Sequence, residues 1–169
     1  MNNGADKTAF LQLIQDNKGI IFKVCNAYCP LMQDREDLAQ EIIYNLWKSW
    51  PGFNNSYKFS TWMYRIALNV AISSYRKKNK DISTISLDEN KTEIIDKIEP
   101  YENTEENSAL LQQFINALNT LDRALMLLYI DGKSYGEIAD ILGITETNTA
   151  TKINRIKNIL KEKVSGLNK

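Results

Sequence analysis

Residues 145–161 carry amide, hydroxyl and basic side chains, many of which would share one side of a helix. Such groups hydrogen-bond to base edges and phosphates, and small residues between them let a helix enter a DNA major groove. Residues 145–169 hold six basic and two acidic side chains, a balance that attracts a polyanion. The candidate contacts with duplex DNA are Asn148, Thr151, Lys152, Asn154, Arg155 and Lys157. The plain alternative is a solvated face on an ordinary helical hairpin.

The residues before this helix predict the corner that would present it. Ser134 and Glu137 have the spacing of a capping box, which opens a short helix. Gly143 can adopt the left-handed conformation that ends this helix, and Thr145 can cap the next one. The apolar positions expected to pack the two helices together are Ile138, Ala139, Leu142, Ile144, Ile153, Ile156 and Leu160. The pattern predicts a helix-turn-helix over residues 134–161.

A second group of side chains interleaves aromatic rings with cations. The loop 51–59 is rich in turn-forming residues yet contains three aromatic ones, and no acidic residue lies between Glu41 and Asp81. Proteins bind single-stranded nucleic acid by stacking bases on rings and placing cations along the backbone. The candidate contacts are Phe53, Tyr57, Phe59, Arg65, Ile66, Asn69, Arg76, Lys77 and Lys78. The alternative is that the aromatic residues belong to the core.

A long helix over residues 60–79, capped by Ser60, is predicted to carry most of this second group. Its expected buried face is Trp62, Met63, Ile66, Ala67 and Val70. A step of 100° per residue leaves the following residues outside that stripe: Tyr64, Arg65, Leu68, Asn69, Ile72, Tyr75 and Arg76. This outer face is too apolar for ordinary solvated surface, which favours a binding role.

Helical periodicity runs through most of the chain and predicts an all-α fold. Further helices are expected over residues 7–16, 19–29, 34–50, 108–119 and 121–131. The helix at 34–50 has Asp34 as its expected N-cap and Pro51 as its stop. Its buried stripe is Leu38, Ile42, Leu46 and Trp50. Only residues 82–87 alternate in the manner of a strand.

Charge divides the chain into three parts, although its net charge is zero. Residues 1–80 hold 11 basic and 6 acidic side chains, residues 81–109 hold 2 and 9, and residues 110–169 hold 8 and 6. The acidic stretch is polar and lacks a sustained period, as flexible linkers do. The sequence therefore predicts a helical domain over residues 1–80, a linker over 81–107 and a helix-turn-helix domain over 108–169.

Several classes of function are disfavoured. The chain has no histidine, which removes the commonest general base and a common metal ligand. Cys25 and Cys29, four residues apart, suit buried positions on one helix in a reducing compartment better than a disulfide or a four-ligand zinc site. The longest apolar run, residues 124–130, is too short to span a bilayer. We expect a cytoplasmic protein without catalytic site, cofactor, metal or membrane insertion.

Three segments together resemble one family. They are DREDLAQEIIYNLWKSWPGF (34–53), KFSTWMYRIALNVAISSYRKK (58–78) and SYGEIADILGITETNTATKINRIK (134–157). The residue types in these segments, and the order of the segments, are similar to those of the bacterial sigma-70 family, in particular the extracytoplasmic-function (ECF) sigma factors. The resemblance covers nearly the whole chain outside the predicted linker. One difference is that such proteins have a Gly-Thr-Val-Lys-Ser-Arg-like run where this chain has residues 147–152, which are less basic.

The resemblance implies partners and roles. It implies that the chain directs core RNA polymerase to promoters and assists their melting, touching the clamp helices of the largest subunit and the flap of the second-largest. The residues it places on the polymerase are Asp37, Gln40, Glu41 and Tyr44. It implies that residues 53–59 with Ile66 and Asn69 capture a flipped non-template base of the minus-ten element, and that the helix from Thr145 reads the duplex minus-thirty-five element. Such factors are often held by an anti-sigma factor.

Three other readings compete with this one. The first is a regulator in which the helix-turn-helix follows an effector or receiver domain, the second a helical interaction protein, and the third an enzyme with metal carboxylates at Asp34, Glu36, Asp37 and Glu41. The free energy needed to open a promoter favours a protein that works inside a large assembly. Opening a promoter costs on the order of 10 kcal/mol, whereas stacking returns about 1–3 kcal/mol per base. A large partner must therefore supply the rest.

Overall fold

The computed structural model describes residues 3–78 and 104–167, and the regular structure within these ranges is helical throughout. The predicted all-α fold is confirmed for this part. Contacts divide the chain into a first unit, Met1–Lys78, and a second unit, Asn79–Lys169. The strand-like run 82–87 and most of the predicted linker 81–107 lie outside the described residues. Helix α6 begins at Thr104, inside the range predicted as linker.

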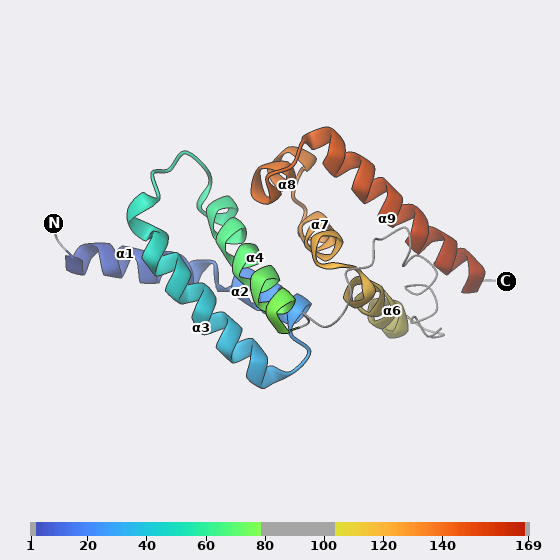
Figure 1. Cartoon of the computed structure of the whole chain (residues 1–169), viewed down its shortest axis with the longest axis horizontal. Coiled ribbons are helices and arrows are strands. Elements are labelled where there is room, and N and C mark those ends of the chain that lie inside the picture. Colours follow the sequence, from blue (N-terminus) through green and yellow to red (C-terminus); the bar gives the residue numbers. More distant parts are fainter. Residues whose placement is uncertain (1–2, 79–103, 168–169) are drawn as a thin grey trace. The chain divides into compact units, whose positions relative to one another are not determined.

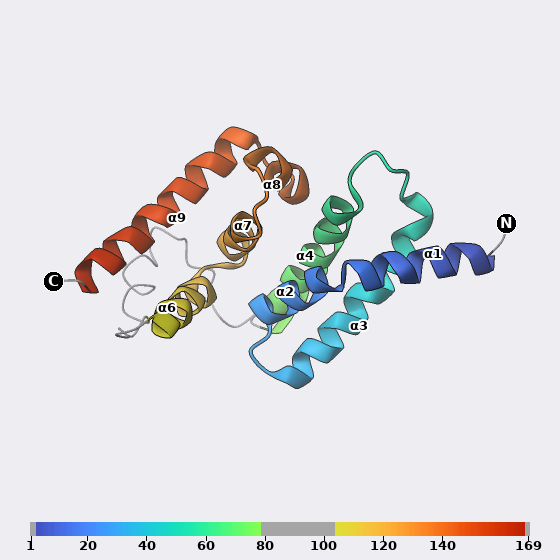
Figure 2. The same cartoon turned by 180° about the vertical axis from the view of Figure 1, so that it is seen from behind.

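The first unit is a helical bundle (Figure 1). Its elements are α1 (Asn3–Asp16), α2 (Lys18–Tyr28), α3 (Met32–Ser49), the 3-10 turn η1 (Trp50–Gly52) and α4 (Phe59–Lys78). Helix α4 packs against both α2 and α3, and α2 also packs against α3 (Figure 2). A receiver domain needs strands, and the described part of this unit has none.

The predicted core of α3 is confirmed, but its ends differ from prediction. The stripe Leu38, Ile42 and Leu46 is buried. The helix starts at Met32, so Asp34 lies in its first turn rather than at the N-cap, where the positive end of the helix dipole still favours a carboxylate. It ends at Ser49, and Trp50 follows half-buried in η1.

The face that α4 buries was predicted correctly at Met63 and Ala67, which are buried, and wrongly at other positions. Tyr64 and Leu68, expected outside, are buried at 0% and 1% exposure, whereas Trp62, Ile66 and Val70 are only half-buried. The cause is that α4 has neighbours on two sides, α2 and α3, so its buried arc is wider than one stripe and is rotated. The helix also starts at Phe59, so Ser60 is not its cap.

The second unit contains α6 (Thr104–Ala117), α7 (Thr120–Ile130), α8 (Tyr135–Leu142) and α9 (Glu146–Leu167). Helix α9 packs against α7 and α8 (Figure 1). The predicted core residues Ile138, Ala139, Ile153 and Ile156 are buried. Ile141 and Ile159 take the buried places expected for Leu142 and Leu160, which are half-buried. Each helix is thus rotated slightly from its predicted orientation.

Candidate nucleic-acid interface

The corner between α8 and α9 forms through the local contacts that the sequence predicts. Ser134 Oγ accepts a hydrogen bond from the N–H of Glu137 at 3.1 Å and caps α8. Gly143 ends α8 in the left-handed conformation, with φ 70° and ψ 33°. Thr145 Oγ1 accepts from the N–H of Asn148 at 3.0 Å and caps α9. The helix-turn-helix prediction is confirmed in its capping and its turn.

Helix α9 carries all the side chains predicted to contact duplex DNA. Asn148, Thr151, Asn154 and Lys157 are exposed, while Lys152 and Arg155 are half-buried. Thr151 Oγ1 donates to the carbonyl of Thr147 at 3.0 Å, so its hydrogen is already used. Its oxygen remains available as an acceptor for the amino group of adenine or cytosine.

The loop between η1 and α4 rests on a set of packed rings, here named the aromatic cluster. Its members are Phe10, Trp47, Trp50, Phe53, Phe59 and Trp62. The ring centroids of Phe53 and Phe59 are 5.6 Å apart, and those of Phe53 and Trp62 5.1 Å. Both phenylalanines are half-buried. The structure therefore gives these two predicted DNA contacts a structural role in supporting the loop.

Tyr57 is the exposed ring of this loop. Its side chain is 47% exposed, and the Arg65 guanidinium lies 5.0 Å from the ring centroid. The backbone before it is fixed locally, because Asn54 Oδ1 accepts from the N–H of Ser56 and Asn55 has a φ of 61°. The structure thus brings Tyr57 and Arg65 together, as an aromatic and cationic surface requires.

The remaining predicted residues of this group lie along α4. Asn69 is exposed and Ile66 half-buried, one helical turn apart. Arg76, Lys77 and Lys78 form the exposed last turn. Lys78 Nζ lies 3.6 Å from Asp34 Oδ1, so its charge is partly matched by α3 at the surface.

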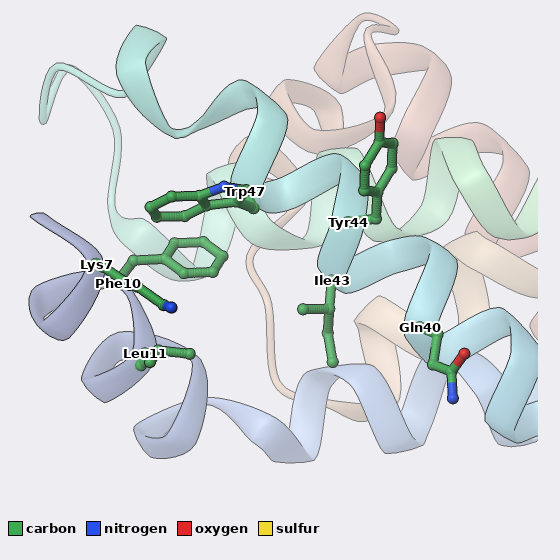
Figure 3. A pocket seen from close by; sticks show the side chains of 7 residues that line it. All are labelled: Lys7, Phe10, Leu11, Gln40, Ile43, Tyr44 and Trp47. Carbon is green, nitrogen blue, oxygen red and sulfur yellow. The ribbon is translucent and has the colours of Figure 1, made fainter. Parts of the chain in front are cut away.

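A groove between α1 and α3, here the α1–α3 groove, opens beside the residues predicted to contact polymerase. It has a volume of about 350 Å³ and is lined by Lys7, Phe10, Leu11, Gln40, Ile43, Tyr44 and Trp47. Figure 3 shows Phe10 and Trp47 facing each other at one end of it. Asp37, Gln40, Glu41 and Tyr44 are all exposed on α3. Sequence reasoning missed the groove, although Ile43, Tyr44 and Trp47 lie off the buried stripe and are large for exposed positions.

Family models match both units. Sigma-70 region 2 matches residues 13–81, and the sigma-70 region 4 model matches residues 108–160. The first match covers α2, α3, the loop and α4, with the α3 side of the groove, and the second covers the helix-turn-helix. The chain belongs to the sigma-70 family. Its relatives identify it as an ECF sigma factor, a protein that directs core RNA polymerase to promoters.

Curated relatives of this sigma factor match along almost their whole length. The ECF RNA polymerase sigma factor SigW of Bacillus subtilis is 28% identical, over 96% of this chain and 92% of its own. The ECF RNA polymerase sigma-E factor of Escherichia coli K12 is 26% identical, over 96% and 90%. The relatives thus contain both matched regions in one chain of similar length.

Two solved structures share the fold of this sigma factor. The sigma factor RpoE in complex with the anti-sigma factor NepR, from Bartonella quintana, has a TM-score of 0.70 at 19% identity, over 93% of this chain and 97% of its own. CnrH in complex with the cytosolic domain of CnrY has a TM-score of 0.67 at 19% identity, over 95% and 90%. At 19% sequence identity, the similarity to these two structures shows a shared fold.

The two cysteines of this sigma factor are free and buried in the first unit. Burial, with the neighbouring Cys29 sulfur, raises the pKa of Cys25 to about 11, so its thiol is protonated at neutral pH. No group of three metal-ligating side chains occurs among the residues described. None of the helices in that part of the chain is long and apolar enough to cross a membrane.

Proposed function

We propose that this sigma factor holds its promoter at two places, through one surface on each unit. The observation that carries the proposal is the difference in chemistry between the two surfaces. Helix α9 presents small polar and basic side chains on a capped helix-turn-helix, which suits the major groove of duplex DNA. The first unit presents an exposed ring, a cation above it and a basic helix end, which suits unpaired bases.

The assignment of promoter elements follows the resemblance to ECF sigma factors, and the chemistry of the two surfaces supports it. Helix α9 contacts the duplex minus-thirty-five element through Asn148, Thr151, Lys152, Asn154, Arg155 and Lys157. The loop and α4 take the non-template strand of the minus-ten element through Phe53, Tyr57, Phe59, Arg65, Ile66, Asn69, Arg76, Lys77 and Lys78. The packed Phe53 and Phe59 act mainly by holding Tyr57 in place.

The exposed face of α3 contacts core polymerase in this proposal. Asp37, Gln40, Glu41 and Tyr44 lie off its buried stripe. Two of them, Gln40 and Tyr44, line the apolar α1–α3 groove. The clamp helices of the largest subunit and the flap of the second-largest are the expected polymerase surfaces. We further propose that the chain acts in the cytoplasm, has no catalytic activity of its own, and is held by an anti-sigma factor when inactive.

The first test is reconstitution with core polymerase. The purified chain is expected to bind core enzyme and to start transcription at promoters where core alone gives no defined start. Mapping transcript ends after overproduction of the chain supplies those promoters. If a chain that lacks the second unit initiates transcription to the same level as the full chain, this result would contradict the two-surface model.

Replacing Asn69 with alanine is expected to reduce open-complex formation by about tenfold, because a buried base edge loses its hydrogen-bonding partner. Permanganate reactivity of unpaired thymines measures opening, and footprinting of the upstream duplex measures retention of α9. The footprint is expected to persist. Asn26, an exposed asparagine on α2, gives the matched control, and Asn26→Ala should open the promoter like the wild type. Equal loss of opening and footprint would argue against a flipped-base contact at Asn69.

A further inference from the structure

A contact between α7 and α9 joins a residue predicted to touch DNA with one outside the helix-turn-helix. Lys157 Nζ donates a hydrogen bond to Tyr129 Oη at 3.2 Å. The same ammonium lies 5.1 Å from the centroid of the Tyr129 ring. Tyr135, the first residue of α8, places its ring 6.4 Å from that of Tyr129. The contact thus lies where the end of α7, the start of α8 and the middle of α9 meet.

The chemistry of this pair decides what it can bind. An ammonium group has donors only, so Tyr129 Oη must be the acceptor, and its own O–H proton stays available to a further acceptor. Lys157 keeps two more N–H donors. The adjacent positive charge polarises the tyrosine hydroxyl and makes it a stronger donor. The pair therefore offers several hydrogen-bond donors outward, together with a full positive charge, and this combination fits an anionic oxygen.

The contact also holds the lysine in place. Lys157 is exposed, and a free lysine side chain loses conformational entropy when it binds a phosphate. Hydrogen bonding to Tyr129 raises the pKa of Lys157, because the contact favours the charged ammonium. Part of the ordering is thus complete before DNA arrives, which favours binding.

We propose that Tyr129 and Lys157 form one phosphate-binding unit, in which the tyrosine hydroxyl and the lysine ammonium donate to the same backbone phosphate of duplex DNA. The inference rests on the proposed function, because it requires α9 to lie on a duplex. It adds Tyr129 of α7 to the DNA-binding surface and changes the role of Lys157 from an independent contact to one member of a pair.

The test measures binding of the full chain to a labelled duplex of arbitrary sequence across a series of salt concentrations. Lys157→Met keeps the apolar stem and removes the charge, and it should lower the slope of log affinity against log salt by about one. Tyr129→Phe keeps the ring and all charges, so it should leave the slope unchanged and weaken binding about fivefold. In the Lys157→Met background, Tyr129→Phe should cost less than about twofold, because the hydroxyl then acts without its partner.

Matched controls come from the first unit. Lys18→Met and Lys48→Met remove exposed charges from α2 and α3, and both should leave the duplex affinity and its salt slope unchanged. Wild-type affinity in Tyr129→Phe, or the same loss in both backgrounds, would overturn the paired unit while leaving the proposed function intact. Failure of the wild type to bind duplex DNA would overturn both.

Discussion

Replacing Trp50 with alanine is expected to lower the unfolding free energy of the first unit by about 3 kcal/mol. The Trp50 ring lies 5.5 Å from that of Phe10, 5.6 Å from Phe53 and 6.1 Å from Trp62, measured between centroids. It therefore joins α1, the loop and α4. Its removal leaves a cavity among rings that the fixed helices cannot close.

Intrinsic fluorescence can follow this loss in one unit alone. The three tryptophans, Trp47, Trp50 and Trp62, all belong to the first unit, so the fluorescence transition in urea reports on that unit. Trp47→Ala is the matched control. Trp47 is 42% exposed at the groove, and its loss should cost only about 1 kcal/mol. Equal urea midpoints for the two variants would show that Trp50 stabilises the first unit no more than Trp47 does.

The Trp50 variant should also lose promoter opening under conditions where the first unit stays folded. Without this ring the loop that carries Tyr57 loses part of its support. Binding to core polymerase should change less, because the exposed face of α3 is untouched. Permanganate reactivity and core-binding titrations separate the two effects.

Replacing Arg123 with methionine is expected to destabilise the second unit by about 2–3 kcal/mol. Arg123 is 5% exposed, and its Nη2 donates to the carbonyls of Asn116 at 2.7 Å and Leu118 at 3.1 Å. These carbonyls belong to the end of α6 and the residue just after it, where helices have no partners of their own. The substitution leaves the two carbonyls without this donor and removes a charge that the helix dipole favours.

Far-UV circular dichroism in urea measures this change, with fluorescence as an internal reference for the first unit. The dichroism transition of the second unit should move to lower urea while the fluorescence midpoint stays in place. Lys133→Met is the control. Lys133 pairs with Glu137 at 3.8 Å near the surface and should contribute less than about 0.5 kcal/mol. A parallel shift in fluorescence would show that the two units unfold together.

The sequence predicted best where structure depends on a few neighbouring residues. Ser134, Gly143 and Thr145 behave as predicted, because capping and a left-handed turn are decided within about one helical turn. It predicted worst on α4. Whether Tyr64 is buried depends on α2 as well as α3, and the periodicity of α4 alone contains no record of a second neighbour.

The sequence predicted which surfaces form the site better than it predicted which side chains contact one another there. On α9, four of the six predicted contacts are exposed and two are half-buried, because polar residues cannot be buried cheaply there. The Lys157–Tyr129 pair joins residues 28 positions apart, and no local pattern predicts it. Which side chains of α9 touch which bases depends on the bound DNA and remains a prediction.

The α1–α3 groove and the loop are built from shared rings. Phe10 and Trp47 line the groove, and Phe10 also lies against Trp50, which stacks on Phe53 at the start of the loop. A protein bound in the groove therefore contacts rings of the same aromatic cluster that supports the loop with Tyr57. A partner that orders these rings pays the entropic cost of ordering, and by thermodynamic linkage a base captured at the loop then binds more tightly.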